Sequence, residues 1–278
     1  MSKQTDLRMK NIFAVLFLIF LAFFSCKKAE NSNAKTSEKA ETKEVSAKLL
    51  ATDSIKTIDS SKLNENLTAI FISSVLVFPN LTNKVLLDSI YSPVNLKLKE
   101  YSKEKISAEI DAHKKEYFAD TKKSLEDWSP DFPQTWEQNS YMKKFSILNN
   151  FMTLQYKADG YTGGAHGYYN ELYRVFDVKT NRQITLTDIM KMRDAKIWSR
   201  ILMDHFLKND LDQGQGQMLL VKEIPLNDNF YFDQDNLYFL YNQYEIAAYA
   251  AGPVLIKIPY SEIKPFLTQD FRTKLNLN

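Results

Sequence analysis

The stretch Asp159-Gly-Tyr-Thr-Gly-Gly-Ala-His-Gly-Tyr-Tyr-Asn170 stands out because four of the chain's seven glycines fall within eight of its residues. Glycine is favoured where the backbone must adopt a positive φ angle or where another group approaches the main chain closely. Residues typical of β-strands flank the stretch, at 141–156 and 168–178. The sequence therefore predicts a hairpin of two strands joined by an elaborate loop, which we call the glycine loop (residues 160–167).

The glycine loop carries His166, one of only three histidines in the chain. One interpretation is structural: the glycines permit a tight connection, and His166 and Thr162 hydrogen-bond its backbone. The other is functional: exposed amides and tyrosines form a recognition surface, because tyrosine supplies rigid, amphipathic contact area. The candidate ligand-binding residues are Tyr161, Thr162, Gly163, Gly164, His166, Tyr168, Tyr169, Glu245 and Tyr249.

Strand and helix patterns alternate irregularly along the rest of the chain. Strands are expected at 67–78, 230–232, 237–241 and 254–258. Helices are expected at 104–127, 187–208 and 259–267, with Thr187 as the N-cap of the second. This order predicts an α+β fold with antiparallel sheets, packed helices and two intimately associated subdomains, at 61–180 and 181–278.

The N-terminus has the features of an export signal. Lys3, Arg8 and Lys10 accompany an apolar run from Ile12 to Phe24, which is shorter than the about 20 residues of a spanning helix. Ser25 then precedes Cys26, the only cysteine of the chain, as at a lipoprotein processing site. We expect a signal peptide at 1–25 and lipid attachment at Cys26, which would anchor the chain to a membrane at the outer membrane or cell surface. An uncleaved N-terminal anchor is the alternative.

The composition changes after Cys26. Residues 26–60 are rich in Lys, Glu, Ser and Thr, which predicts a flexible tether, with a single solvated helix as the alternative.

Residues 1–25 carry three positive charges and one negative charge, so the remainder is formally neutral, against +2 for the whole chain. A nucleic-acid-binding domain normally has a basic excess, so no nucleic-acid partner is expected.

Five short sequence words occur in an order that resembles a known pair of extracytoplasmic domains. They are Tyr161-Thr-Gly-Gly-Ala-His-Gly167, Phe176-Asp-Val-Lys-Thr180, Ile184-Thr-Leu-Thr-Asp188, Tyr244-Glu-Ile-Ala-Ala-Tyr-Ala-Ala-Gly-Pro253 and Ile258-Pro-Tyr-Ser-Glu-Ile263. The order resembles the RsiV-type lysozyme-sensing anti-sigma factors and the accessory domains of PdaC-type peptidoglycan deacetylases. The resemblance implies a role at the cell envelope, with cell-wall glycan or a lysozyme-like protein as the partner.

The chain departs from both families in the parts that signal or catalyse. No cytoplasmic domain precedes the apolar run, so sigma-factor binding is not expected. His113, His166 and His205 are widely separated, unlike the clustered metal ligands of a deacetylase. We therefore expect a non-catalytic binding module without catalytic residues, metal or cofactor. The alternative is a cell-wall hydrolase or deacetylase that uses His166 with a nearby carboxylate; Glu245 should either reach solvent or pair with Arg174 or His166.

The lipoprotein interpretation predicts that a fatty-acid analogue fed to producing cells labels the wild-type protein. The Cys26→Ala variant should carry no label, because the acylated thiol and the processing site are both lost. Equal labelling of the two proteins would contradict lipid attachment at Cys26.

Overall fold

A computed structural model describes residues 50–210 and 214–277. The expected signal peptide, Cys26 and most of the expected tether lie outside this part. The strands are β1 (Asp53–Lys62), β2 (Leu67–Val77), β3 (Gln134–Leu148), β4 (Phe151–Tyr161), β5 (Tyr168–Asp177), β6 (Arg182–Gln183), β7 (Phe230–Phe232), β8 (Asn236–Tyr241) and β9 (Val254–Pro259). The α-helices are α2 (Lys84–Tyr91), α3 (Lys103–Ser124), α4 (Leu186–Ile189), α5 (Ala195–Asn209), α6 (Tyr260–Ile263) and α7 (Gln269–Leu275). No helix in the described part is long and apolar enough to cross a membrane.

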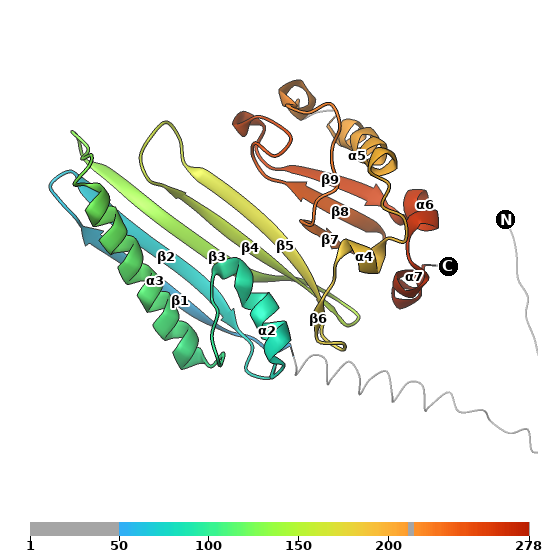
Figure 1. Cartoon of the computed structure of the whole chain (residues 1–278), viewed down its shortest axis with the longest axis horizontal. Coiled ribbons are helices and arrows are strands. Elements are labelled where there is room, and N and C mark those ends of the chain that lie inside the picture. Colours follow the sequence, from blue (N-terminus) through green and yellow to red (C-terminus); the bar gives the residue numbers. More distant parts are fainter. Residues whose placement is uncertain (1–49, 211–213, 278) are drawn as a thin grey trace, which may run out of the picture. The chain divides into compact units, whose positions relative to one another are not determined.

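Six strands form the larger sheet, in the order β1-β2-β3-β4-β5-β6. Neighbouring strands are antiparallel except β2 and β3, which are parallel. A parallel pair needs a long crossover connection, and the segment that carries α2 and α3 supplies it on one face of the sheet (Figure 1). The α+β class is confirmed, but the larger sheet is mixed rather than antiparallel throughout, because β2 and β3 are parallel. Helix α2 was not expected.

The first hydrophobic core lies between this sheet and its two helices. Along β2 every second residue is buried, as expected for a strand with one covered face, and Phe71 and Val75 belong to this core. Helix α3 begins at the N-cap Ser102, whose side chain accepts from the Lys105 amide. It buries Ile106 and Ile110 on the side that packs against the sheet.

Three antiparallel strands, β7-β8-β9, form the smaller sheet. Helix α5 packs on β9, and Trp198, Leu202 and Phe206 of α5 are buried in the second core. Phe151, Tyr173 and Val175 of the larger sheet also belong to this core. The expected hairpin at 230–241 and the expected strand at 254–258 are confirmed; the proposed division at residue 180 stays a prediction.

Three boundaries differ from the sequence-based expectation. Strand β1 begins at Asp53, within the stretch expected to be tether, because its backbone pairs with β2 and Ile55 is buried.

The strand expected at 141–156 is in fact parts of two strands, β3 and β4, which are joined by a turn at Asn149 with a φ of 54°. Asparagine tolerates this left-handed conformation, which ends the first strand there.

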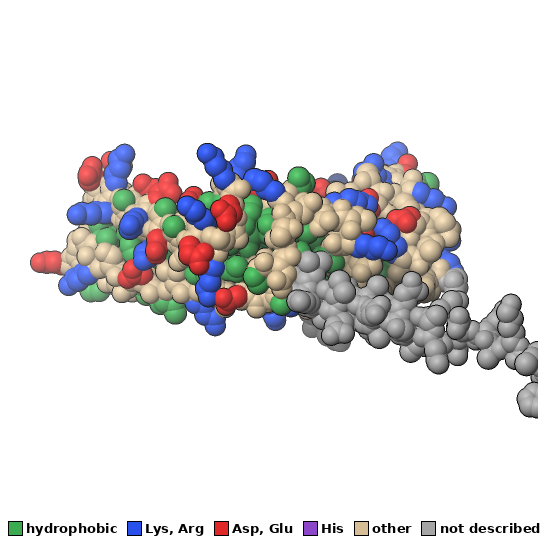
Figure 2. Space-filling model, turned by 90° about the horizontal axis from the view of Figure 1, so that it is seen from below, with side chains coloured by type: hydrophobic (Ala, Val, Ile, Leu, Met, Phe, Trp, Pro, Cys, Tyr) green, Lys and Arg blue, Asp and Glu red, His purple; other side chains and the backbone are tan. Residues whose placement is uncertain are grey.

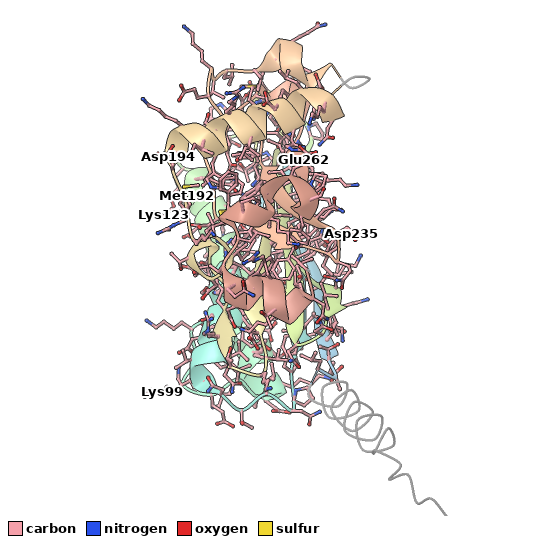
Figure 3. The ribbon with its side chains drawn as sticks, turned by 90° about the vertical axis from the view of Figure 1, so that its right-hand side faces the viewer. Lys99, Lys123, Met192, Asp194, Asp235 and Glu262 are labelled. Atoms are coloured by element: carbon pink, nitrogen blue, oxygen red, sulfur yellow. The ribbon has the colours of Figure 1, made fainter. Side chains whose placement is uncertain are left out.

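The helix expected at 187–208 is interrupted. Its N-cap is Thr185 rather than Thr187, and Thr185 forms a capping box with Asp188 around the short helix α4. Met190 then becomes extended and forms a bridge with Leu267. Asp194 starts α5 by accepting from the amides of Lys196 and Ile197, and Figure 3 shows it at the beginning of that helix. Tertiary pairing at Met190 therefore overrides the continuous helical periodicity.

Two asparagines join the smaller sheet to the edge of β5. Asn229, directly before β7, donates to the Glu171 carbonyl and accepts from the Tyr173 amide, both at 2.8 Å. Asn242, directly after β8, accepts from the Glu171 amide at 2.7 Å and donates to its carbonyl at 3.1 Å. Each asparagine side chain uses one N–H donor and its carbonyl oxygen here, as a peptide group of a neighbouring strand would. Together they cover this part of the β5 edge where a further strand would pair.

Candidate functional site

The glycine loop connects β4 to β5 as the sequence predicts, and its glycines have conformational reasons. Gly163 has a φ of 90°, and a Cβ atom there would lie 3.0 Å from the Trp136 ring. At Gly160 a Cβ atom would lie 2.1 Å from the Glu137 carbonyl oxygen of the neighbouring strand. Gly160 therefore excludes a side chain and Gly163 disfavours one, which agrees with the structural interpretation.

Two side chains bind the backbone of the loop. The Tyr161 hydroxyl donates to the Gly164 carbonyl at 3.0 Å. The Nδ1 atom of His166 lies 2.8 Å from the Gly167 carbonyl oxygen, so this nitrogen carries the proton and donates. The expected backbone bond from His166 is present; the expected one from Thr162 is not among the hydrogen bonds of the described residues.

The other nitrogen of His166 faces a residue 78 positions later in the chain. Its Nε2 atom lies 3.4 Å from the Tyr244 hydroxyl. The His166 ring stacks on Tyr249, with centroids 4.0 Å apart and an interplanar angle of 24°. The Tyr244 ring lies 5.9 Å from that of Tyr249 and is 60% exposed. We call His166, Tyr244 and Tyr249 the aromatic trio.

Tyr244 was absent from the sequence-based candidates, although a local turn signal accompanies it. Its φ is 67°, which is unusual for a large side chain. The turn is closed by a bond from the Tyr244 amide to the Ala247 carbonyl and by one from the Glu245 amide to the Asn242 carbonyl. The turn thus directs the Tyr244 ring outward, towards the glycine loop.

Glu245 has a positioning role within the same turn. Its Oε2 atom accepts a hydrogen bond from the backbone amide of Asn242 at 3.0 Å, and the Glu245 side chain is exposed. The first expected alternative, access to solvent, is therefore the one observed; Arg174 instead donates to the carbonyls of Tyr173 and Asp228. Since the Asn242 side chain holds the β5 edge, Glu245 links the turn of the aromatic trio to the larger sheet.

The remaining candidates diverge onto different surfaces. Thr162 and Tyr168 line a groove on the face of the larger sheet that carries the helices. Tyr169, the next residue of β5, points to the opposite face because side chains alternate along a strand. There its hydroxyl donates to Glu171, and Lys157 lies over its ring. The nine sequence-predicted residues therefore do not form one compact site.

Glu171 is the buried carboxylate of that opposite face. It accepts from the hydroxyls of Tyr169 and Tyr173 and from the Gln155 amide, and Lys157 lies 3.4 Å away. Burial acts to raise the pKa of Glu171, but these hydrogen bonds and the nearby lysine outweigh it and hold the pKa below its usual range. Burial and the bond to Glu171 raise the pKa of Tyr169. The alternation Tyr169, Glu171, Tyr173 was the overlooked sequence signal for this network.

The other ionisable groups that the structure describes form pairs and small networks. Within the described residues, no group of three His, Cys, Asp or Glu side chains could hold a metal ion. His205 is buried with its Nε2 atom 3.1 Å from Glu262, which Figure 3 labels in α6. Glu137 and Asp159 both accept from the Asn139 side-chain nitrogen, at 3.1 and 2.8 Å. In Figure 2, acidic, basic and hydrophobic side chains are interspersed over the face shown.

Residues 175–261 match the family model DUF3298. That family is described as a protein of unknown function. The matched region contains the Tyr244–Tyr249 turn and both asparagines of the β5 edge, and it begins after the glycine loop. No curated protein matches the chain.

Two crystal structures of DUF3298 family members are similar to this chain. The one from Bacteroides fragilis NCTC 9343 is 21% identical, with a TM-score of 0.69, over 82% of this chain and 98% of that one. The one from Pseudomonas aeruginosa PAO1 is 18% identical, with a TM-score of 0.58, over 80% and 96%. At these identities the likeness concerns the fold. The finer resemblance to RsiV-type and PdaC-type proteins stays a hypothesis.

Single replacements of Gly163 and Gly164 by alanine should separate two costs in unfolding free energy, that of the positive φ angle and that of the contact with Trp136. Both glycines have positive φ, 90° and 93°, so each substitution should cost about 1–2 kcal/mol of unfolding free energy. Gly163→Ala should cost a further 1–3 kcal/mol, roughly, because its methyl group meets the Trp136 ring. Gly164→Ala is the matched control, since no atom lies within 4 Å of its Cβ position. Equal losses in urea unfolding would contradict the packing of the loop on Trp136.

Proposed function

We propose that this protein is a cell-envelope lipoprotein whose described part is a non-catalytic binding module for cell-wall glycan or a lysozyme-like protein. The observation that carries the binding proposal is the aromatic trio, in which an exposed loop and an exposed turn from distant parts of the sequence bring three rings together. The anchoring proposal rests on Ser25 and Cys26 after the apolar run, which lie outside the described residues.

The chemistry of the trio suits recognition. Tyrosine rings provide large contact areas at little cost in conformational entropy, and a histidine among them adds a hydrogen-bonding edge. The rings are held in place, because His166 binds the Gly167 carbonyl and the Tyr244 turn is closed by its own backbone bonds. Such preorganisation reduces the ordering cost of binding.

The geometry around His166 favours binding over catalysis. A general base needs a free nitrogen near the reacting proton and a partner that orients the ring. Here one nitrogen donates to a backbone carbonyl and the other faces the Tyr244 hydroxyl. The Glu245 carboxylate accepts a hydrogen bond from the backbone amide of Asn242 and does not orient His166. The enzyme alternative would therefore require the Tyr244 hydroxyl to leave Nε2 and a carboxylate to approach His166.

Truncation of the trio should weaken binding without unfolding the protein. Tyr244→Ala and Tyr249→Ala should each lower the affinity for insoluble peptidoglycan or for immobilised lysozyme by roughly 5- to 100-fold, the range for loss of an aromatic anchor. Sedimentation with peptidoglycan and surface plasmon resonance on lysozyme would measure this. Ile58→Ala is the control, because Ile58 is an exposed apolar residue on the far edge strand β1.

Two outcomes would overturn the proposal. If wild-type protein is retained by neither peptidoglycan nor lysozyme, the binding role fails. If purified protein releases soluble fragments or acetate from peptidoglycan and His166→Ala abolishes that release, the enzyme alternative replaces it.

A further inference from the structure

A groove with a volume of about 1120 Å³ lies on the face of the larger sheet that carries the helices. One wall is formed by residues of α3 between Ile110 and Ser124, and the segment after α2, at Pro93 to Leu96, closes one end. The loop after α3 and the glycine loop contribute Trp128 and Thr162. The groove is thus separate from the aromatic trio, which involves the opposite part of the glycine loop and the smaller sheet.

The floor of the groove is uncharged and capable of hydrogen bonding. Across β2 and β3, Gln138 pairs with Phe71 and Ser140 pairs with Ser73. Ser140 then pairs with Ala158 of β4, which pairs with Asn170 of β5. All these residues line the groove. Their amide and hydroxyl groups can both donate and accept hydrogen bonds. The floor therefore suits a ligand that is rich in hydroxyl or amide groups.

Aromatic rings gather at the end next to the glycine loop. Trp128 is 55% exposed, and its ring lies parallel to that of Trp136, with 6.2 Å between centroids. Tyr168 is 41% exposed, and Tyr117 of α3 also belongs to the lining. Flat apolar rings beside polar groups offer stacking surfaces for the C–H faces of sugar rings.

One buried polar atom beside the groove lacks a hydrogen-bond partner. It is the Tyr117 hydroxyl, for which the described residues provide none. Buried polar groups are nearly always satisfied in folded proteins, by protein or by another molecule. The position of this hydroxyl indicates that a polar ligand or water completes the hydrogen bonding there.

We propose that this groove binds a linear, uncharged oligosaccharide. The lining runs from Trp136 of β3, which pairs with Ala69, to Val75 of β2, a separation of six residues along the strands, or about 20 Å at 3.3 Å per residue. The volume exceeds the roughly 300–1,000 Å³ of pockets for drug-sized ligands, so the groove accommodates a chain of sugars. This inference goes beyond the proposed function: it assigns a second surface and one ligand class, and it stands even if the aromatic trio binds nothing.

Other ligand classes fit the groove less well. Peptides that add to a sheet need a free strand edge. This groove instead lies over the face of β2 to β5, whose edges are paired with neighbouring strands or, at Glu171 and Tyr173, bound by the two asparagines. Phosphate-rich chains need several cationic side chains, and Lys157 is the only Lys or Arg of the lining. Lys157 also pairs with Glu171 on the other face. A lipid would leave the amide and hydroxyl groups of the floor without partners.

Tryptophan fluorescence and calorimetry of the full chain can test the proposal with chitotetraose and cellotetraose as probes. Two of the three tryptophans, Trp128 and Trp136, line the groove, while Trp198 is buried in the second core. Either tetrasaccharide should change the fluorescence and bind saturably. Trp128→Ala and Asn170→Ala should weaken this binding by roughly 5- to 100-fold, and Trp128→Phe should retain most of it. Both replaced side chains are exposed, so the variants should keep the wild-type unfolding temperature.

Ile58→Ala on β1 is the control, because Ile58 is exposed and lies outside the groove lining, and it should leave tetrasaccharide affinity unchanged. The proposal is overturned if neither tetrasaccharide binds at millimolar concentration. It is also overturned if Trp128→Ala and Asn170→Ala bind as tightly as the wild type, or if a fluorescent fatty acid fills the groove and excludes both sugars.

Discussion

The edge of β5, covered by Asn229 and Asn242, is the contact on which the arrangement of both candidate surfaces depends. Three backbone groups of Glu171 and Tyr173 find their partners in these two side chains. Each would cost about 1–3 kcal/mol if buried without a partner. Because the two asparagines flank the β7–β8 hairpin, the same bonds hold the smaller sheet against the larger one. The Tyr244 turn, which directly follows Asn242, is thereby placed beside the glycine loop.

Strand β5 serves two surfaces through its alternation. Tyr168, Asn170 and Leu172 face the groove beneath the helices. Tyr169, Glu171 and Tyr173 face the other way, where the ionised Glu171 gathers two hydroxyls, an amide and a lysine. A shift of one residue in the pairing of β5 would exchange these sets. The asparagine bonds to Glu171 and Tyr173 oppose such a shift, since they match donors and acceptors at one register only.

Local patterns in the sequence were sufficient for part of this account. The clustered glycines predicted the loop between β4 and β5, and aromatic runs around 230–241 predicted the second hairpin. The helix at α3 was predicted from its spacing of apolar residues. The break between α4 and α5 was not, because Met190 pairs with Leu267 from the far end of the chain. The β3–β4 turn was overlooked although Asn149 and Asn150 mark it.

The composition of the sites depended on contacts that no local pattern contains. His166 meets Tyr244 and Tyr249 only after the smaller sheet has docked, so Tyr244 was not among the candidates. Trp128 and Trp136 come together across the loop between α3 and β3. The groove depends on a parallel pairing of β2 with β3 that the sequence did not indicate. Conversely, Tyr169 and Glu245 were predicted to bind a ligand because of their residue types. In the structure they take part in hydrogen-bond networks that support the fold.

Hydrogen exchange of individual backbone amides tests the closure of the β5 edge most directly. The amides of Glu171 and Tyr173 point to the two asparagine side chains. They should exchange as slowly as amides inside the β3–β4 ladder, and Asn229→Ala should release the Tyr173 amide selectively. Rapid exchange of both amides in the wild-type protein would show that the asparagines do not hold this edge, and would contradict the account of how the two sheets place the loop and the turn together.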